Sequence, residues 1–294
     1  SSSESSAKLT ERNILGFGHL ISGNIKNRFD TKERAVYAQY SINNIKNTYI
    51  RLDLDYANDY NNDSKRSINI NRPFYSVITK NAGGAFFENR LRTEQFPVLD
   101  TISLQNVSYD FQEYWYGRAF KINPKSNPER YFNNMVLALT YNQKVFGQMP
   151  EAVLDPTSYF SNEKNWIGMI GFSKQKFYQD KFVFNYNITE DIPYGENIAL
   201  IVGHQEKNSN SRLYTGLSVS FGRKYSFGYA SGFAEWGSFY DAGLTEQTTF
   251  KLGLNYFSPL ISWGNWRFRQ FVKPTYVWGN NRDDSFKDRL TLLD

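Results

Sequence analysis

The sequence contains no cysteine, only two histidines and no long run of apolar residues. Without cysteine, disulfide staples and thiolate metal sites are excluded. His19 and His204 lie far apart in the chain, so a histidine-rich metal cluster is excluded as well. No segment approaches the roughly 18 apolar residues that a membrane helix needs, but barrel strands cross membranes with a weaker, alternating signal. These absences are therefore compatible with a membrane protein that crosses the bilayer with β-strands.

The composition is rich in aromatic residues and yet polar. Aromatic residues make up 17% of the chain, while the mean hydropathy is −0.59. Tyr and Phe favour strands, and a barrel wall with one apolar and one polar face has this balance. The net charge is +5, but basic and acidic residues are interleaved. Because no single basic stripe forms, nucleic-acid binding is not expected.

Apolar and polar side chains alternate with a period of two in several segments. The clearest are 50–56, 135–142, 213–222 and 249–256, and a shorter one pairs Trp266 and Phe268 with Arg267 and Arg269. Successive side chains of a strand point to opposite faces, so each segment has one apolar side. The sequence predicts strands at about 14–28, 33–43, 47–58, 66–74, 83–95, 104–120, 131–146, 165–178, 181–188, 196–206, 212–223, 226–240, 246–257 and 265–279.

Many of these strands are longer than the roughly six residues of globular strands and reach the roughly nine to eleven that tilted membrane strands need. The pattern therefore predicts an all-β protein, a transmembrane antiparallel β-barrel with up-and-down meander topology. A soluble sandwich or propeller also alternates and is the competing interpretation. We expect one domain over 1–294, with 1–10 as a disordered segment or linker, and no sustained helical pattern.

The connections and aromatic residues fit the same interpretation. Long polar loops are expected at 58–63, 123–130 and 147–164, and tight turns at 44–46 and 179–180. Outer-membrane barrels have long loops on one side and short turns on the other. Aromatic residues crowd 109–120 and 257–266, as in the girdles at membrane–water boundaries.

Motifs for chemistry are lacking. There is no G-x-S-x-G elbow and no Walker loop, and Glu190 and Asp191 lie in a segment whose Pro and Gly mark a turn. The carboxylates of Asp53, Asp55, Asp59 and Asp63 could hold a cation. The simpler interpretation is that Asp53 and Asp55 face a water-filled lumen and that Asp59 and Asp63 lie in a loop. We therefore expect no enzyme, no cofactor and no metal site.

Charged residues in the polar phase of the strands are expected to face the lumen. There they form ion-pair ladders or tune conductance. The residues concerned are Arg51, Asp53, Asp55, Lys251, Arg267 and Arg269.

Three segments together resemble the BamA/TamA superfamily of outer-membrane assembly factors, particularly its Bacteroidetes-type members. Residues 11–18 (ERNILGFG) are similar to the N-L-x-G-x-G opening of the family's barrel, and 189–195 (TEDIPYG) look like a mid-barrel turn. Residues 71–84 are similar to the family's R-P-F-Y-S…T-K…G-G turn between early strands. The matching positions are Arg72, Pro73, Phe74, Tyr75, Thr79, Lys80, Gly83 and Gly84.

The resemblance implies a barrel of roughly sixteen strands at the bacterial outer membrane. It also implies preceding POTRA domains and a lumen loop with a Val-Arg-Gly-Phe motif, neither of which this sequence contains. We therefore expect an incomplete portion of a barrel, whose first and last strands are not joined by a continuous ladder. The implied partners are outer-membrane lipid, client outer-membrane or secreted proteins, and other envelope assembly components.

The implied mechanism is lateral opening at a weakly paired first strand, because a free strand edge accepts another strand. The candidate gate strand runs from Gly16 to Phe29 and includes Gly18 and Gly23, since glycine weakens strand order. The glycines could equally serve only to relieve crowding in a curved wall. A passive channel or secretion pore, and a barrel that anchors another domain of the same polypeptide, are the alternative functions.

Overall fold

The computed structural model describes residues 3–60, 63–76, 78–98, 101–122, 132–185 and 188–282. Their strands form one antiparallel meander of 15 strands, in which each strand from β1 to β13 pairs with its neighbours in sequence. This bears out the all-β class expected from the alternation. The strands are β1 (Glu4–Glu11), β2 (His19–Arg28), β3 (Arg34–Ile42), β4 (Arg51–Asn58), β5 (Ser64–Arg72), β6 (Asn81–Val98), β7 (Thr101–Lys121), β8 (Phe132–Gln148), β9 (Glu163–Lys181), β10 (Thr189–Lys207), β11 (Asn210–Tyr225), β12 (Gly228–Asp241), β13 (Leu244–Phe257), β16 (Phe271–Val272) and β17 (Thr275–Asn280).

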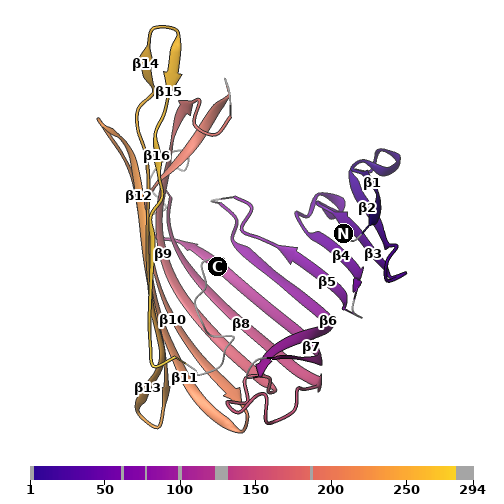
Figure 1. The fold of residues 1–294 in the computed structure, drawn as a ribbon. Coiled ribbons are helices and arrows are strands. Elements are labelled where there is room, and N and C mark those ends of the chain that lie inside the picture. The colour runs from indigo at the N-terminus through magenta and orange to yellow at the C-terminus, as the bar shows by residue number, and fades with distance from the viewer. Residues whose placement is uncertain are drawn as a thin grey trace.

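The sheet curls into a trough. Figure 1 shows the N-terminal strands β1–β3 facing the C-terminal strands β12–β16 across an opening. Strand length changes along the sheet: β1 has 8 residues, whereas β7 has 21 and β10 has 19. The N-terminal arm is therefore held by shorter ladders than the C-terminal wall.

The described strands do not close into a barrel. β1 pairs with β2, and at the other end β16 and β17 pair with β13; in the described part of the chain no ladder joins the two ends. This agrees with the expectation that the first and last strands are not continuously paired. Each end of the sheet presents a strand edge whose backbone groups lack a strand partner there.

Residues 4–10 differ from the expectation of a disordered segment or linker over 1–10. Glu4–Glu11 form β1, which pairs with β2 in a regular register from Glu4↔Arg28 to Glu11↔Ile21. The segment alternates small and polar residues with little apolar content, so its pairing depends on a neighbouring strand and leaves no local signal in the sequence.

The segment 189–195 was wrongly expected to be a turn, and 181–188 a strand. Residues 163–181 form β9 and 189–207 form β10, so the connection lies between them. Pro193 is tolerated within β10 because the first six residues of β10 pair with β9 only; pairing with β11 begins at Gly195. A proline fits such an edge, where its missing N–H costs no ladder bond. The expected turn at 179–180 likewise lies inside β9.

The expected strand at 265–279 is broken into short pieces. A separate hairpin of β14 (Ile261–Trp263) and β15 (Trp266–Phe268) projects beyond the sheet (Figure 1), and the chain then returns through β16 and β17. Pro274 separates β16 from β17, since proline cannot donate to a ladder.

In the part of the chain that the structure describes, the helical content is confined to short 3-10 turns. Two, Ile14–Gly16 and Ile45–Asn47, connect strands. Among the described residues, no helical segment has the length and apolarity needed to cross a membrane.

Long loops and short turns are not cleanly segregated to opposite ends of the sheet. The connections 59–63 and 149–162 share one end, with the tight turns 208–209 and 242–243 also at that end. The loop expected at 123–130 lies outside the described residues. The turn expected at 44–46 falls on the second 3-10 turn, at the opposite end of the sheet.

Candidate functional site

The outer face of the curled sheet is an apolar band. Antiparallel partners share a face, so the register places unbroken rows of apolar side chains across the C-terminal wall. Several of these side chains are exposed by 37% to 49%, far more apolar surface than water-soluble proteins usually show. One row consists of Leu137, Ile170, Leu200, Leu217, Trp236 and Phe250, and the next of Met135, Phe172, Ile198, Val219, Ala234 and Leu252.

A row of rings borders this band. Tyr114 and Tyr141 stack at 6.5 Å, Tyr141 and Trp166 lie 5.5 Å apart, and Trp166 and His204 lie 5.7 Å apart, all between ring centroids. One residue pair further along the strands, the same face turns polar, with Gln112 donating to Gln143 at 2.8 Å. Amphipathic rings favour such a position between an apolar and a polar environment.

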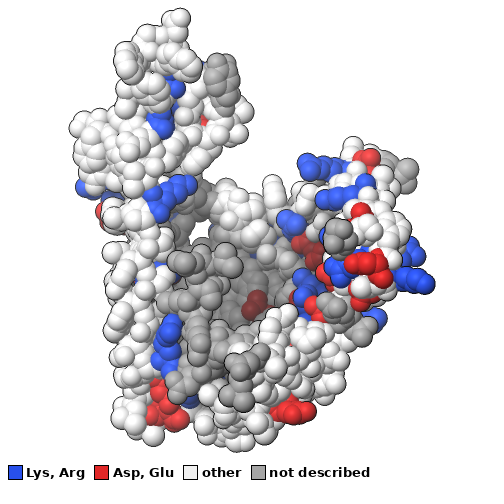
Figure 2. Space-filling model, in the orientation of Figure 1, with Lys and Arg blue, Asp and Glu red and all other residues white. Residues whose placement is uncertain are grey.

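The inner face is polar and internally bonded. Ser41 donates to Asp53 at 2.7 Å, and Asn165 donates to Asn142 at 2.7 Å across neighbouring strands. Lys144 and Glu163 form an ion pair of 3.5 Å. Figure 2 shows charges of both signs crowding the N-terminal strands at right, whereas the outer flank at left carries only scattered charges.

The residues expected to face the lumen divide into two groups. Arg51 pairs with Asp53 at 2.7 Å, Ser67 donates to Asp55 at 3.3 Å, and Lys251 lies on the same face, opposite Glu235. Arg267 and Arg269, by contrast, do not belong to a wall strand. Arg267 lies on β15, and Arg269 follows it and anchors the projecting hairpin to Asp180 at 3.2 Å.

The four carboxylates considered for a cation are not gathered into one site. Asp53 and Asp55 are engaged on the wall, and Asp63 accepts a hydrogen bond from the Thr93 N–H at 2.6 Å. Within the described ranges, no group of three or more acidic, histidine or cysteine side chains could hold a metal ion.

The described residues 72–76 and 78–84, which comprise the connection between β5 and β6 and the strand ends beside it, are tightly bonded, and we call this segment the turn 72–84. Arg72 donates to the carbonyls of Thr48 and Asn81, at 3.0 and 2.5 Å. The Tyr75 ring stacks on Tyr49 at 3.7 Å and lies under the Arg72 guanidinium at 5.3 Å. The turn between β3 and β4 is thereby fixed to this one.

Further hydrogen bonds and a close backbone approach hold the rest of the turn 72–84. Thr79 is buried, and its hydroxyl accepts the N–H of Ser76 at 3.1 Å. The Lys80 carbonyl accepts the N–H of Ala119 at 2.8 Å. A Cβ on Gly84 would lie 2.8 Å from the Ile70 carbonyl, so glycine is required there by close approach. The pairing of β5 ends at Arg72, as expected from the proline at position 73.

The candidate gate residues do not lie on the edge strand. Gly16 and Gly18, with φ of +80° and +70°, shape the turn between β1 and β2. Gly23 lies within β2, between Leu9 and Ala38 of the two flanking strands, and Phe29 follows β2. The edge is instead β1, which the sequence did not reveal.

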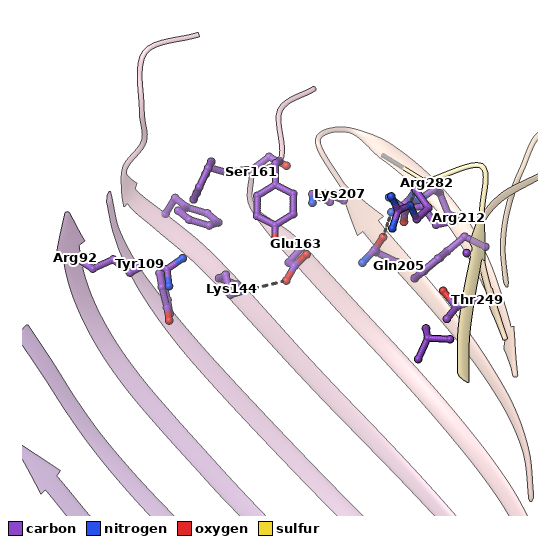
Figure 3. A pocket seen from close by; sticks show the side chains of 17 residues that line it. Arg92, Tyr109, Lys144, Ser161, Glu163, Gln205, Lys207, Arg212, Thr249 and Arg282 are labelled. Carbon is purple, nitrogen blue, oxygen red and sulfur yellow. Dashed lines mark hydrogen bonds and ion pairs between the residues drawn. The ribbon is translucent and has the colours of Figure 1, made fainter. Parts of the chain in front are cut away.

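The inner face also contains a hollow of about 540 Å³. Its lining comes from β6–β13, β17 and the loop 149–162, so it can lie only on the concave side. Figure 3 shows Lys144, Glu163 and Lys207 on successive strands of its floor, with Arg212 and Gln205 joined by a hydrogen bond at one side. Sequence analysis missed this hollow because its residues are brought together only by strand pairing.

The fold and its faces define an open, all-β antiparallel wall with one apolar and one polar surface. A scan against protein-family models, a search of curated proteins and a search of solved structures each found no match for this chain.

Proposed function

We propose that this chain forms the wall of a bacterial outer-membrane β-barrel protein of the BamA/TamA type, which assists the insertion, assembly or translocation of proteins at the outer membrane. The observation that carries the membrane part is the apolar outer face bordered by the Tyr114–Tyr141–Trp166–His204 row, opposite a polar inner face. Lipid requires an apolar exterior, and a lumen tolerates polar groups. The role is non-catalytic and needs no cofactor.

The edge strand supports the assembly part. The Phe29 N–H donates to the Ser3 carbonyl at 3.0 Å, so Ser3 and Phe29 form a hydrogen-bonded pair. Such pairs alternate along an antiparallel ladder, which makes Ala7 and Ile25 a bonded pair as well. The N–H and C=O groups of Ser6 and Lys8 then point to the free edge. A client strand could pair with these groups, and outer-membrane lipid, client proteins and other envelope assembly components are the proposed partners.

Replacing Lys8 with proline should remove one free-edge donor and leave the ladder between β1 and β2 intact. We expect the variant, in the complete polypeptide reconstituted into lipid vesicles, to lose most of the acceleration with which the wild type folds an unfolded eight-stranded outer-membrane barrel. The measurement is the folded fraction of the client against time by gel mobility.

The matched control is Lys8→Ala, which removes the same side chain but keeps the N–H, and should fold the client like the wild type. Equal acceleration by Lys8→Pro would refute strand templating at this edge. A wild type that conducts stably in planar bilayers and accelerates no client would favour a passive channel or secretion pore instead.

We also propose that the turn 72–84 faces the periplasm, following the family resemblance. Ser76 lies in this turn, and a cysteine there should stay unlabelled when intact cells are treated with a membrane-impermeant thiol reagent. After the outer membrane is permeabilised, labelling should become rapid. Because the chain has no native cysteine, the signal reports this site alone. Rapid labelling in intact cells would show that the topology is inverted.

A further inference from the structure

We propose that the hollow on the inner face is a binding site for a sugar-sized anion, a molecule that carries a phosphate or carboxylate group on a hydroxylated ring. Its volume of about 540 Å³ lies within the range of small-molecule sites. The site goes beyond the proposed assembly function, because its lining comes from β6–β13, β17 and the loop 149–162 and not from β1, the edge proposed to pair with a client strand.

The charge of the lining favours an anion. Five basic side chains border the hollow, and Glu163 is the acidic residue among its lining residues. Two further carboxylates, Glu94 and Glu246, form ion pairs with Arg92 and Arg212. Basic side chains therefore predominate among the described residues that line the hollow, a concave space where charges are less screened than on an open surface. The basic residues are Arg92, Lys144, Lys207, Arg212 and Arg282.

Two buried polar atoms in the lining have no hydrogen-bond partner within the protein. The Ser161 side chain is only 7% exposed, and its Oγ atom is without a partner, as is the Nε atom of Arg92. A buried donor that is left unsatisfied costs free energy. Ser161 borders the hollow, so an anion bound beside it would supply this hydroxyl with the acceptor that the protein does not provide.

The loop 149–162, which positions Ser161, is held in place by hydrogen bonds and apolar packing. The carboxylate of Asp155 accepts the N–H groups of Tyr159 and Phe160, at 2.8 and 2.9 Å. Phe160 is 3% exposed and packs against Phe96 and Val107, which ties the loop to β6 and β7. The loop therefore closes one side of the hollow in a fixed conformation.

Aromatic rings provide the surface for a sugar ring. Lys207 lies 5.0 Å above the Tyr159 ring, and Lys144 lies 5.3 Å from the Tyr109 ring. Each of these rings therefore lies beside a cation in the lining of the hollow, so the lining offers apolar ring atoms next to a positive charge.

The experiment measures binding of glucose 6-phosphate, glucuronate and glucose to the purified full chain in detergent micelles, by isothermal titration calorimetry. We expect saturable binding of at least one of the two anions, at least tenfold tighter than that of glucose, and weaker at high salt. The anion that binds more tightly identifies the charged group. If neither anion binds saturably, or glucose binds as well, the proposal is wrong.

Variants locate the site. Ser161→Ala should lower the affinity about tenfold and leave the fold unchanged, since the hydroxyl has no partner to lose. Lys207→Gln should lower it at least as much. The control is Lys251→Gln, which removes a cation from the same face outside the hollow and should bind like the wild type. Wild-type affinity in both Ser161→Ala and Lys207→Gln, or an equal loss in Lys251→Gln, would overturn the assignment.

Discussion

Replacing Gly195 with alanine is expected to destabilise the protein by about 3 kcal/mol or more. Gly195 has a φ of +149°, which side chains with a Cβ rarely adopt. An alanine Cβ would also meet the backbone carbonyl of Lys174, with the Cα of Gln175 3.1 Å away. Both obstacles are backbone atoms, so no side-chain rotation can relieve them, and β9 and β10 would have to separate locally.

The measurement is the free energy of unfolding from urea titrations in detergent micelles, followed by tryptophan fluorescence. Gly171→Ala is the matched control on the neighbouring strand. Its Cβ would lie 3.6 Å from Ala199 and 3.7 Å from the Ile198 carbonyl, an ordinary contact that should change stability by less than about 1 kcal/mol. Similar losses in the two variants would show that the backbone at Gly195 is not constrained.

The alternation of side chains predicted the strands and their two faces wherever a strand carries a clean apolar phase. The predicted segments 50–56, 135–142, 213–222 and 249–256 correspond to β4, β8, β11 and β13, with only Ile50 lying just before its strand. Asp53 and Lys251 are on the polar face, opposite the apolar phase. These positions follow from the period of two alone. When one side of a strand is apolar and the other polar, only one orientation places each side in a matching environment.

Prediction failed where pairing overrides the local pattern. β1 lacks an apolar phase and is held by β2, so nothing in residues 4–11 marked it. Pro193 and Gly195 suggested a turn, but Pro193 lies in the part of β10 that pairs with β9 only, where proline is tolerated. Trp266 and Phe268 alternate with two arginines, yet Pro274 and the anchor from Arg269 to Asp180 end the strand early.

The candidate functional site was likewise predictable from the sequence only in part. The turn 72–84 could be singled out from its Pro and Gly residues, although the stacking of Tyr49 on Tyr75 joins two hairpins and is not visible in the sequence. The hollow could not be predicted, because Lys144, Lys207 and Arg212 lie on three strands whose register alone brings them together. The closest signal was Tyr159-Phe160, two adjacent aromatic residues in the loop 149–162.

Replacing Leu252 with arginine should cost about 2–4 kcal/mol of stability in lipid if the side chain lies near the bilayer midplane, because the charge there loses its hydration. Leu252 is 39% exposed on the outer face, between Ala234 and Tyr276 of the neighbouring strands. In a sheet surrounded by water, the same exposed position would tolerate arginine with almost no change. The variant therefore separates the two environments more sharply than a core mutation could.

The measurement is a urea titration of folding into lipid vesicles, with Lys251→Ala as the control at the same depth on the same strand. Lys251 faces the inner side, opposite Glu235, so its loss should cost far less than the arginine at position 252. The difference between adjacent residues reports which face meets lipid, since β13 pairs identically in both variants. Equal sensitivity at the two positions would sink the lipid-facing assignment of the apolar band, and with it the proposed place of this wall in the outer membrane.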